Sequence, residues 1–244
     1  MKKELRQQIK HDEFASGLEK AIAWASSHGD ELRIALGVVV VLLAAGGALA
    51  YFQAQRAREA ERAFLDAVAS FEAPVSGQSP PGAEPPAGQV FVTAEDKWKT
   101  TAAAFEGVER RYGSLAFGAR AKYFAALARI ELGQYAEAEK SLKEVQARGD
   151  GLEPQLARLA LAGLYRRRGE TDRAVEAYRS LVSDPAAALP RDYALYCLAG
   201  ALEDAKRSAP ARAAYQELFE YYPASVYAAE ARRRVEYLAT ATPS

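Results

Sequence analysis

The segment LGQYAEAEKSLKEV, residues 132–145, sets a small residue, Ala138, before two large apolar residues, Leu142 and Val145. Spacings of four and then three residues place all three on one face of an α-helix. The same pattern recurs at intervals of 37, 36 and 37 residues. The small residues are Thr101, Ala138, Ala174 and Ala211. The large residues four positions later are Phe105, Leu142, Tyr178 and Tyr215. The large residues three positions after those are Val108, Val145, Leu181 and Leu218. A period of this length indicates a helical repeat protein.

A second helix is expected before each of the last three of these small residues. Twelve residues upstream stand Ala126, Ala162 and Ala199. Small residues at these places let two antiparallel helices approach closely, while the large ones fill the space between successive pairs. The spacing resembles the tetratricopeptide repeat, whose small residue in helix A, Ala and aromatic in helix B, and terminal Pro fall at the same offsets. The resemblance implies an all-α fold, a solenoid of paired helices.

Two departures from the tetratricopeptide pattern are visible. No Trp opens helix A, and Lys206 stands where the turn between the helices has Gly in the other repeats. The usual repeat has 34 residues, so the extra residues are expected in turns between repeats. Such turns are expected at Gly149-Asp150-Gly151 and at Ala186 to Leu189.

Both ends of the repeat array are also expected to be helical. The last helix, Tyr227 to Leu238, would form the first half of a further repeat and act as a polar cap. Gln53 to Glu72 and Thr93 to Tyr112 would form an opening repeat, with Thr93 as N-cap. Between them, Ala73 to Gln89 contains five Pro among Gly and Ser, which predicts a flexible insertion rather than a packed element.

One uninterrupted apolar run, Ile34 to Phe52, contains no charged residue, Asn, Gln or Pro. As a helix, its 19 residues span about 28 Å, close to the hydrocarbon thickness of a bilayer. We expect a single transmembrane helix at residues 34–52 that contacts the lipid. A cleaved signal peptide ending near Ala48-Leu49-Ala50 is the main alternative. The run is preceded by 33 residues, many more than the short basic n-region that precedes the apolar core of an ordinary signal peptide. A membrane anchor that is not cleaved is therefore favoured.

The segments on either side of this run define the expected organisation. Residues 1–33 form an N-terminal segment with an amphipathic helix from about Lys3 to Ser26, which would lie on the membrane or dock on a membrane partner. Residues 53–239 form the repeat domain with the insertion at 73–89, and residues 240–244 form a tail. A long C-terminal domain translocates largely regardless of charge, so the first segment is placed in the cytoplasm and the repeats outside it.

The composition after the apolar run argues against an enzyme. Residues 53–244 contain no His, which removes Ser-His-Asp and Cys-His mechanisms and most zinc sites. The single cysteine, Cys197, is expected to be a buried structural thiol. Lys and Arg balance Asp and Glu at 32 each over the whole chain, so no basic stripe for nucleic acid is indicated. We therefore expect no catalytic residue, cofactor, metal or small-molecule substrate.

Surface recognition of a protein partner is the remaining class of function. Side chains of the A helices line the concave face of a repeat solenoid, and Tyr and Arg are enriched in binding hot spots. Two alternatives stay open: the tyrosines fill the core, and the run Arg166-Arg167-Arg168 is a solvated helix end. The residues expected to face the groove are Arg120, Tyr123, Arg166, Arg167, Tyr193, Tyr196 and Glu203.

The whole chain, apart from residues 73–89, resembles the YfgM family of ancillary SecYEG translocon subunits. The features are Lys10-His11-Asp12-Glu13-Phe14 followed by Trp24, His28 and Leu32, the one apolar span, and the repeats. The resemblance implies a non-enzymatic protein of the bacterial inner membrane, with its N-terminus in the cytoplasm and its repeats in the periplasm. The implied partners are the translocon and a membrane-anchored periplasmic chaperone. A scaffold for division, secretion or pilus machinery is the second hypothesis, and a regulator of a membrane enzyme or a hydrolase is the weakest.

Overall fold

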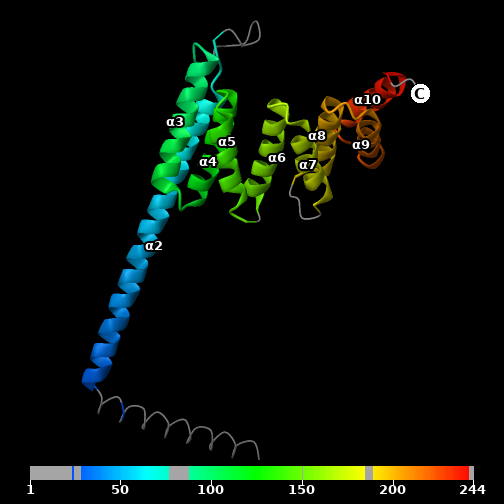
Figure 1. Ribbon diagram of the computed structural model, residues 1–244. Helices are drawn as coiled ribbons and strands as arrows, with labels where there is room; N and C mark the ends of the chain where they lie inside the picture. Colours follow the sequence, from blue (N-terminus) through cyan, green and yellow to red (C-terminus); the bar gives the residue numbers. More distant parts are fainter. Residues whose placement is uncertain (1–23, 25–28, 77–87, 150, 185–188, 242–244) are drawn as a thin grey trace, which may run out of the picture. The chain divides into compact units, whose positions relative to one another are not determined.

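The computed structural model describes residues 24, 29–76, 88–149, 151–184 and 189–241 (Figure 1). All regular elements in these ranges are α-helices, as the sequence predicts, and one isolated β-bridge joins Val75 to Phe91. The chain forms two compact units, Met1–Arg56 and Ala57–Ser244. The helix expected at Lys3 to Ser26 lies outside the described residues except for Trp24. The helices are α2 (Gly29–Glu72), α3 (Ala94–Tyr112), α4 (Ala116–Glu131), α5 (Tyr135–Gln146), α6 (Leu152–Arg167), α7 (Thr171–Ser183), α8 (Arg191–Asp204), α9 (Ser208–Tyr221) and α10 (Ala228–Ala241).

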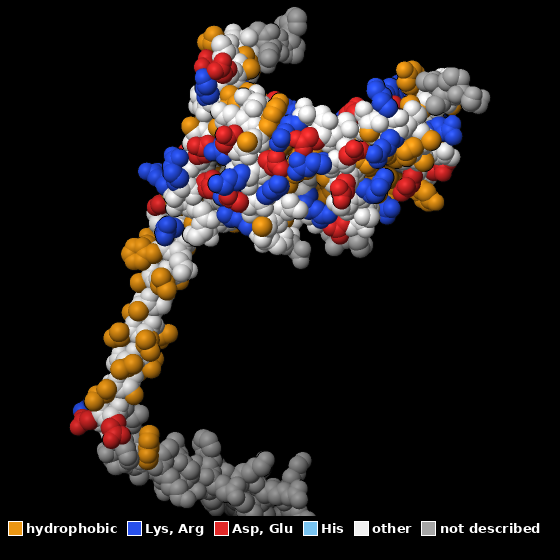
Figure 2. Space-filling model, viewed as in Figure 1, with side chains coloured by type: hydrophobic (Ala, Val, Ile, Leu, Met, Phe, Trp, Pro, Cys, Tyr) orange, Lys and Arg blue, Asp and Glu red, His pale blue; other side chains and the backbone are white. Residues whose placement is uncertain are grey.

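The apolar run lies in the first part of α2. This helix is long and apolar enough to cross a membrane, judged by length and composition. No residue of its most apolar window is buried, and hydrophobic side chains line this part of the helix in Figure 2. Val41, Leu42 and Leu43 are 65–71% exposed. The run is therefore not a core helix of the described chain.

Helix pairs make up the unit that begins at Ala57. From α3 to α10 each helix contacts the next one in the sequence, and α4 also contacts α6 (Figure 1). The pairs α4–α5, α6–α7 and α8–α9 correspond to helices A and B of three repeats. The closing helix α10 buries Ala228, Ala231 and Leu238 and exposes Arg232 and Arg233, as expected of a polar cap.

The residues that carry the repeat pattern are the residues of the core. Every small position on both helices of the repeats has an exposed fraction of zero, including Ala126, Ala138 and Thr101. The large positions four residues later are no more than 4% exposed. The small residues allow close helix contact and the large ones fill the space between pairs, so the predicted register is confirmed.

The opening repeat is formed by the end of α2 together with α3. Phe64 and Phe71 of α2 pack on Phe105 of α3, with ring centroids 5.5 and 6.5 Å apart. Phe124 of α4 stacks on Phe105 at 5.1 Å. At the start of α3, the Thr93 hydroxyl accepts a hydrogen bond from the Asp96 backbone N–H at 3.0 Å, which confirms the expected N-cap.

The first residues of the Pro-rich stretch are packed, which corrects the expectation that Ala73 to Gln89 is an insertion without packing. Ala73 and Val75 are buried. The Ser76 N–H donates to the Phe91 carbonyl at 2.7 Å, and the Phe91 N–H donates to the Pro74 carbonyl at 3.0 Å. Burial of these apolar side chains, which is favourable by about 25 cal/mol per Å², and the pairing with Phe91 account for the ordered start of this stretch.

The turn between helices A and B has the same geometry in all three repeats. Gly133, Gly169 and Lys206 have φ values of 73°, 74° and 59°. In each turn the following N–H donates to a carbonyl five residues earlier, as from Gln134 to Arg129 and from Arg207 to Leu202. This is the Schellman motif, in which Gly is favoured because it has no Cβ. Lys206 therefore holds a left-handed conformation that its side chain disfavours.

Replacing Lys206 by Gly should stabilise the protein. The left-handed conformation costs a non-glycine residue about 1–2 kcal/mol, and the larger entropy loss of Gly offsets about half of this gain. We expect Lys206→Gly to raise the free energy of unfolding by about 0.5–1 kcal/mol in urea denaturation followed by circular dichroism.

The matched control is Gly169→Ala, because a Cβ atom there would meet no atom within 4 Å and only the backbone conformation is tested. This variant should lose about 1 kcal/mol. An unchanged or lower stability of Lys206→Gly beside a destabilised Gly169→Ala would contradict the account of the turn.

Candidate functional site

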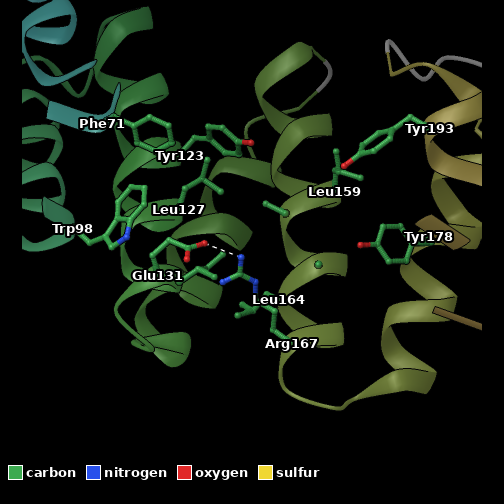
Figure 3. A pocket seen from close by; sticks show the side chains of 13 residues that line it. Phe71, Trp98, Tyr123, Leu127, Glu131, Leu159, Leu164, Arg167, Tyr178 and Tyr193 are labelled. Carbon is green, nitrogen blue, oxygen red and sulfur yellow. Dashed lines mark ion pairs between the residues drawn. The ribbon is translucent and has the colours of Figure 1, made fainter. Parts of the chain in front are cut away.

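A cleft of about 300 Å³ lies over α6 in the repeat unit (Figure 3). Leu159, Ala160, Gly163, Leu164 and Arg167 of α6 form its floor. Residues of α2, α3 and α4 line one side and residues of α7 and α8 line the other. The first side consists of Phe71, Trp98, Tyr123, Leu127, Ile130 and Glu131. The second side consists of Tyr178 and Tyr193. The cleft therefore spans successive helix pairs, as expected of the groove of a repeat solenoid.

Three tyrosines bring hydroxyl groups to this cleft. In Figure 3 the hydroxyls of Tyr123 and Tyr178 point toward α6 from opposite sides. Tyr123 is 9% exposed and Tyr178 is 4% exposed. Burial raises the pKa of both side chains, and burial, followed by the neighbouring Cys197, raises the pKa of Tyr193 to about 12. All three hydroxyls are therefore protonated and neutral over the physiological pH range.

One ion pair lies at the edge of the cleft. Arg167 Nη2 of α6 lies 2.7 Å from Glu131 Oε1 of α4, and Figure 3 draws this pair between the two helices. These are the only charged residues among the 13 that line the cleft. Because they neutralise each other, the cleft has no net charge.

The other charged residues expected to face the groove pair between consecutive A helices. Arg120 of α4 donates to Glu153 of α6 at 2.7 Å, and Arg166 of α6 pairs with Asp204 of α8. A Cβ atom at Gly200 would lie 3.2 Å from an Arg166 guanidinium nitrogen, so Gly200 leaves room for this side chain. On the face visible in Figure 2, cationic and anionic side chains are interspersed over the repeats.

Glu203 of α8 holds the last helix in the same way. It accepts hydrogen bonds from the Arg234 guanidinium of α10 at 2.7 Å and from the Tyr215 hydroxyl at 3.0 Å. Its side chain is only 14% exposed. Burial and this hydrogen bond raise the pKa of Tyr215. Glu203 therefore joins three helices and does not line the cleft.

Tyr196 and Cys197 also lie outside the cleft. Tyr196 stacks on Tyr227 at a centroid distance of 4.7 Å and meets Tyr215 edge-on at 6.1 Å. Tyr196 therefore agrees with the alternative prediction from the sequence, in which the tyrosines fill the core between helices. Cys197 is half-buried rather than fully buried. Burial raises the pKa of its thiol.

The cleft thus brings together three of the seven residues expected from the sequence, Tyr123, Arg167 and Tyr193. It also contains Tyr178, which the repeat pattern marked only as a core position, and Phe71, which lies in the helix expected at Gln53 to Glu72. Trp98 carries no repeat signal and was missed. Among the described residues, no group of three or more His, Cys, Asp or Glu could hold a metal ion.

Replacing Glu203 by Gln should reduce stability, because it removes the negative charge beside Arg234 and replaces one of the two acceptor oxygens with an NH2 group that cannot accept from Arg234 or Tyr215. We expect Glu203→Gln to lower the free energy of unfolding by about 2 kcal/mol, the usual range for hydrogen bonds to charged groups. The measurement is urea denaturation. Glu236→Gln on the exposed face of α10 is the control and should change stability by less than about 0.5 kcal/mol. Equal stabilities of the two variants would show that Glu203 does not hold α10.

Comparison with solved structures agrees with the repeat fold. Two structures of nearly identical TPR-like repeats from a putative kinesin light chain of Podosopora anserina, one of them a variant, share 17% identity with this chain. They cover 60% of this chain and 79% of their own, with TM-scores of 0.51 and 0.52. A tetratricopeptide repeat protein from Parabacteroides merdae shares 17% identity over 60% of this chain and 55% of its own, with a TM-score of 0.48.

No curated protein sequence matches this chain. Residues 23–231 match a family model described as a tetratricopeptide repeat-like domain. Repeats of this kind generally mediate protein–protein interactions through extended grooves and are typically not enzymes. The match covers most of the chain and includes both helices of every repeat, so this protein belongs to the tetratricopeptide repeat-like domain family.

Proposed function

We propose that this protein is a membrane-anchored adaptor that uses the cleft over α6 to bind a protein partner. The observation that carries the proposal is the cleft itself. Aromatic and aliphatic side chains from successive helix pairs converge on one helix, and the two charges among them are paired with each other. A surface of this kind suits the binding and orientation of a partner.

The first part of α2 supports the anchor. Ile34, Leu36 and the residues to Phe52 expose about half or more of most large side chains, and water solvates such a surface poorly. The hydrocarbon core of a bilayer accepts a helix of this length. Since a long C-terminal domain crosses the membrane regardless of its charge, we place the repeats in the periplasm and residues 1–33 in the cytoplasm, with the anchor in the inner membrane.

The resemblance to the YfgM family supports the choice of partner. It favours association with the SecYEG translocon and with a membrane-anchored periplasmic chaperone during protein export. Anchoring in the same membrane raises the effective concentration of the partner near a groove that binds it weakly. Modest affinity in the cleft is then sufficient for an adaptor, and fast release suits a partner that must pass on an exported chain.

The anchor is tested by fractionation. We expect the full chain to stay in the membrane pellet after alkaline carbonate washing, and protease added to spheroplasts to digest the repeats. A Leu42→Arg and Leu43→Arg double variant should lose retention, because each Arg at the centre of a span costs roughly 3 kcal/mol. Recovery of the unaltered protein in the washed soluble fraction, or repeats protected in intact spheroplasts, would overturn the proposed anchor or its orientation.

The adaptor role is tested by photo-crosslinking in cells. A photoreactive amino acid at Leu159 on the cleft floor should crosslink to translocon subunits or a periplasmic chaperone, identified by mass spectrometry. The same amino acid at exposed Arg212 on α9 is the matched control and should give fewer of these products. Division or pilus proteins at Leu159 would favour the scaffold hypothesis instead. Equal, unspecific products at both positions would contradict an adaptor that uses this cleft.

A further inference from the structure

We propose that the cleft over α6 selects an uncharged peptide segment with a bulky apolar or aromatic side chain, and that Tyr123 and Tyr178 hold the backbone of that segment. This inference rests on the proposed function and names the chemistry of the partner at its site. The occupant is an extended segment of the partner protein that lies outside its folded core, because side chains inside a core are not available for binding.

The first argument is the charge of the cleft. Clefts that bind acidic tails present unpaired cationic groups, because a carboxylate needs such partners when water is removed. Here the one cation, Arg167, is paired with Glu131 at 2.7 Å. Arg166 and Arg168, beside it in the sequence, pair with Asp204 and Glu139 respectively. A charged ligand would have to break the Arg167–Glu131 pair or enter unpaired, so a neutral ligand is favoured.

The second argument is that two tyrosine hydroxyls at the cleft have no hydrogen-bond partner among the described residues. Tyr123 and Tyr178 are more than nine-tenths buried, and their hydroxyls point toward α6 from opposite sides (Figure 3). Neither has a hydrogen-bond partner within the described part of the chain, whereas the hydroxyls of Tyr165 and Tyr215 donate to Glu139 and Glu203. Among the described residues, Thr101 Oγ1 is the one fully enclosed side-chain oxygen or nitrogen without a partner, so the hydroxyl oxygens of Tyr123 and Tyr178 stay open to a ligand. An extended peptide supplies carbonyl acceptors and N–H donors on both sides, which these two hydroxyls can engage.

The third argument is the shape of the floor. Gly163 has no side chain, and a Cβ atom there would lie 3.6 Å from the Tyr178 hydroxyl oxygen. Ala160, three residues earlier on α6, also lines the cleft. These two small residues make a depression between Leu159 and Leu164, with Trp98 and Phe71 at one side. A volume of about 300 Å³ is at the lower end of ligand sites and suits one or two apolar side chains.

The test uses the full chain in lipid nanodiscs and three fluorescent peptides of equal length with blocked ends. Each is an 11-residue Gly-Ser peptide whose centre is Phe-Leu-Phe, Asp-Glu-Asp or Lys-Arg-Lys. Binding is followed by fluorescence polarisation, with empty nanodiscs to subtract partition into lipid. We expect the Phe-Leu-Phe peptide to bind at least tenfold more tightly than either charged peptide.

Two kinds of variant assign the binding to the cleft. Gly163→Leu fills the depression and should weaken binding of the Phe-Leu-Phe peptide at least tenfold. Gly107→Leu, the same change inside α3 away from this cleft, is the matched control and should leave binding unchanged. Tyr123→Phe and Tyr178→Phe each remove one hydroxyl and should weaken binding about fivefold. Circular dichroism checks that all variants keep the helical content of the original chain.

The outcomes separate this inference from the proposed function. Equal or tighter binding of a charged peptide, no binding of any peptide, or full binding by folded Gly163→Leu would overturn the chemistry assigned to the cleft. If crosslinks from Leu159 in cells persist beside such a result, the adaptor role stands and only the ligand chemistry fails. If those crosslinks are also absent, both fail.

Discussion

The repeat unit depends on close approach between the two helices of each pair. That approach is possible because an alanine, or Thr101 in the opening repeat, lies at each crossing with no exposed surface. A larger side chain there would have to displace a neighbouring helix, at a cost of about 1–3 kcal/mol. The large residue four positions later then fills the space toward the next pair. The geometry of the cleft follows from this packing, because its floor lies on an A helix, α6, and its sides are formed by A and B helices that this packing holds in place.

Ion pairs between successive A helices keep the array in register. Arg120 with Glu153, Arg166 with Asp204, and Arg234 with Glu203 each connect neighbouring repeats. Each such pair contributes little to stability where it is exposed, but the pairs occupy the charged groups of this face. Aromatic and aliphatic side chains are then the groups left to contact a ligand. The sequence suggested a groove that binds through Tyr and Arg. In our proposal, the cleft binds through apolar contacts and tyrosine hydroxyls, and the arginines are paired.

The opening end of the array differs from the middle. Its first helix is the end of α2, whose earlier part is the apolar run, and Phe71 of α2 lines the cleft. Packing of Phe64 and Phe71 on Phe105 and Phe124 joins this helix to α3 and α4. The Val75–Phe91 bridge joins the chain after α2 to the chain before α3. An adaptor gains from this arrangement, because the same helix that would hold the protein at the membrane also completes the binding surface.

The sequence by itself determined the helical class, the repeat register and the anchor-like run. These features depend on local periodicity and on residue size, which are visible at fixed spacings such as Ala138, Leu142 and Val145. Even the strained turn at Lys206 could be located, because Gly133 and Gly169 mark its equivalents. The tertiary structure alone decided which groove residues are available. Whether Arg166 is free or paired depends on Asp204, 38 residues away, and whether Tyr178 serves the core or the cleft depends on the absent side chain of Gly163. Contacts between helices far apart in the chain have no fixed spacing, so no periodic pattern records them.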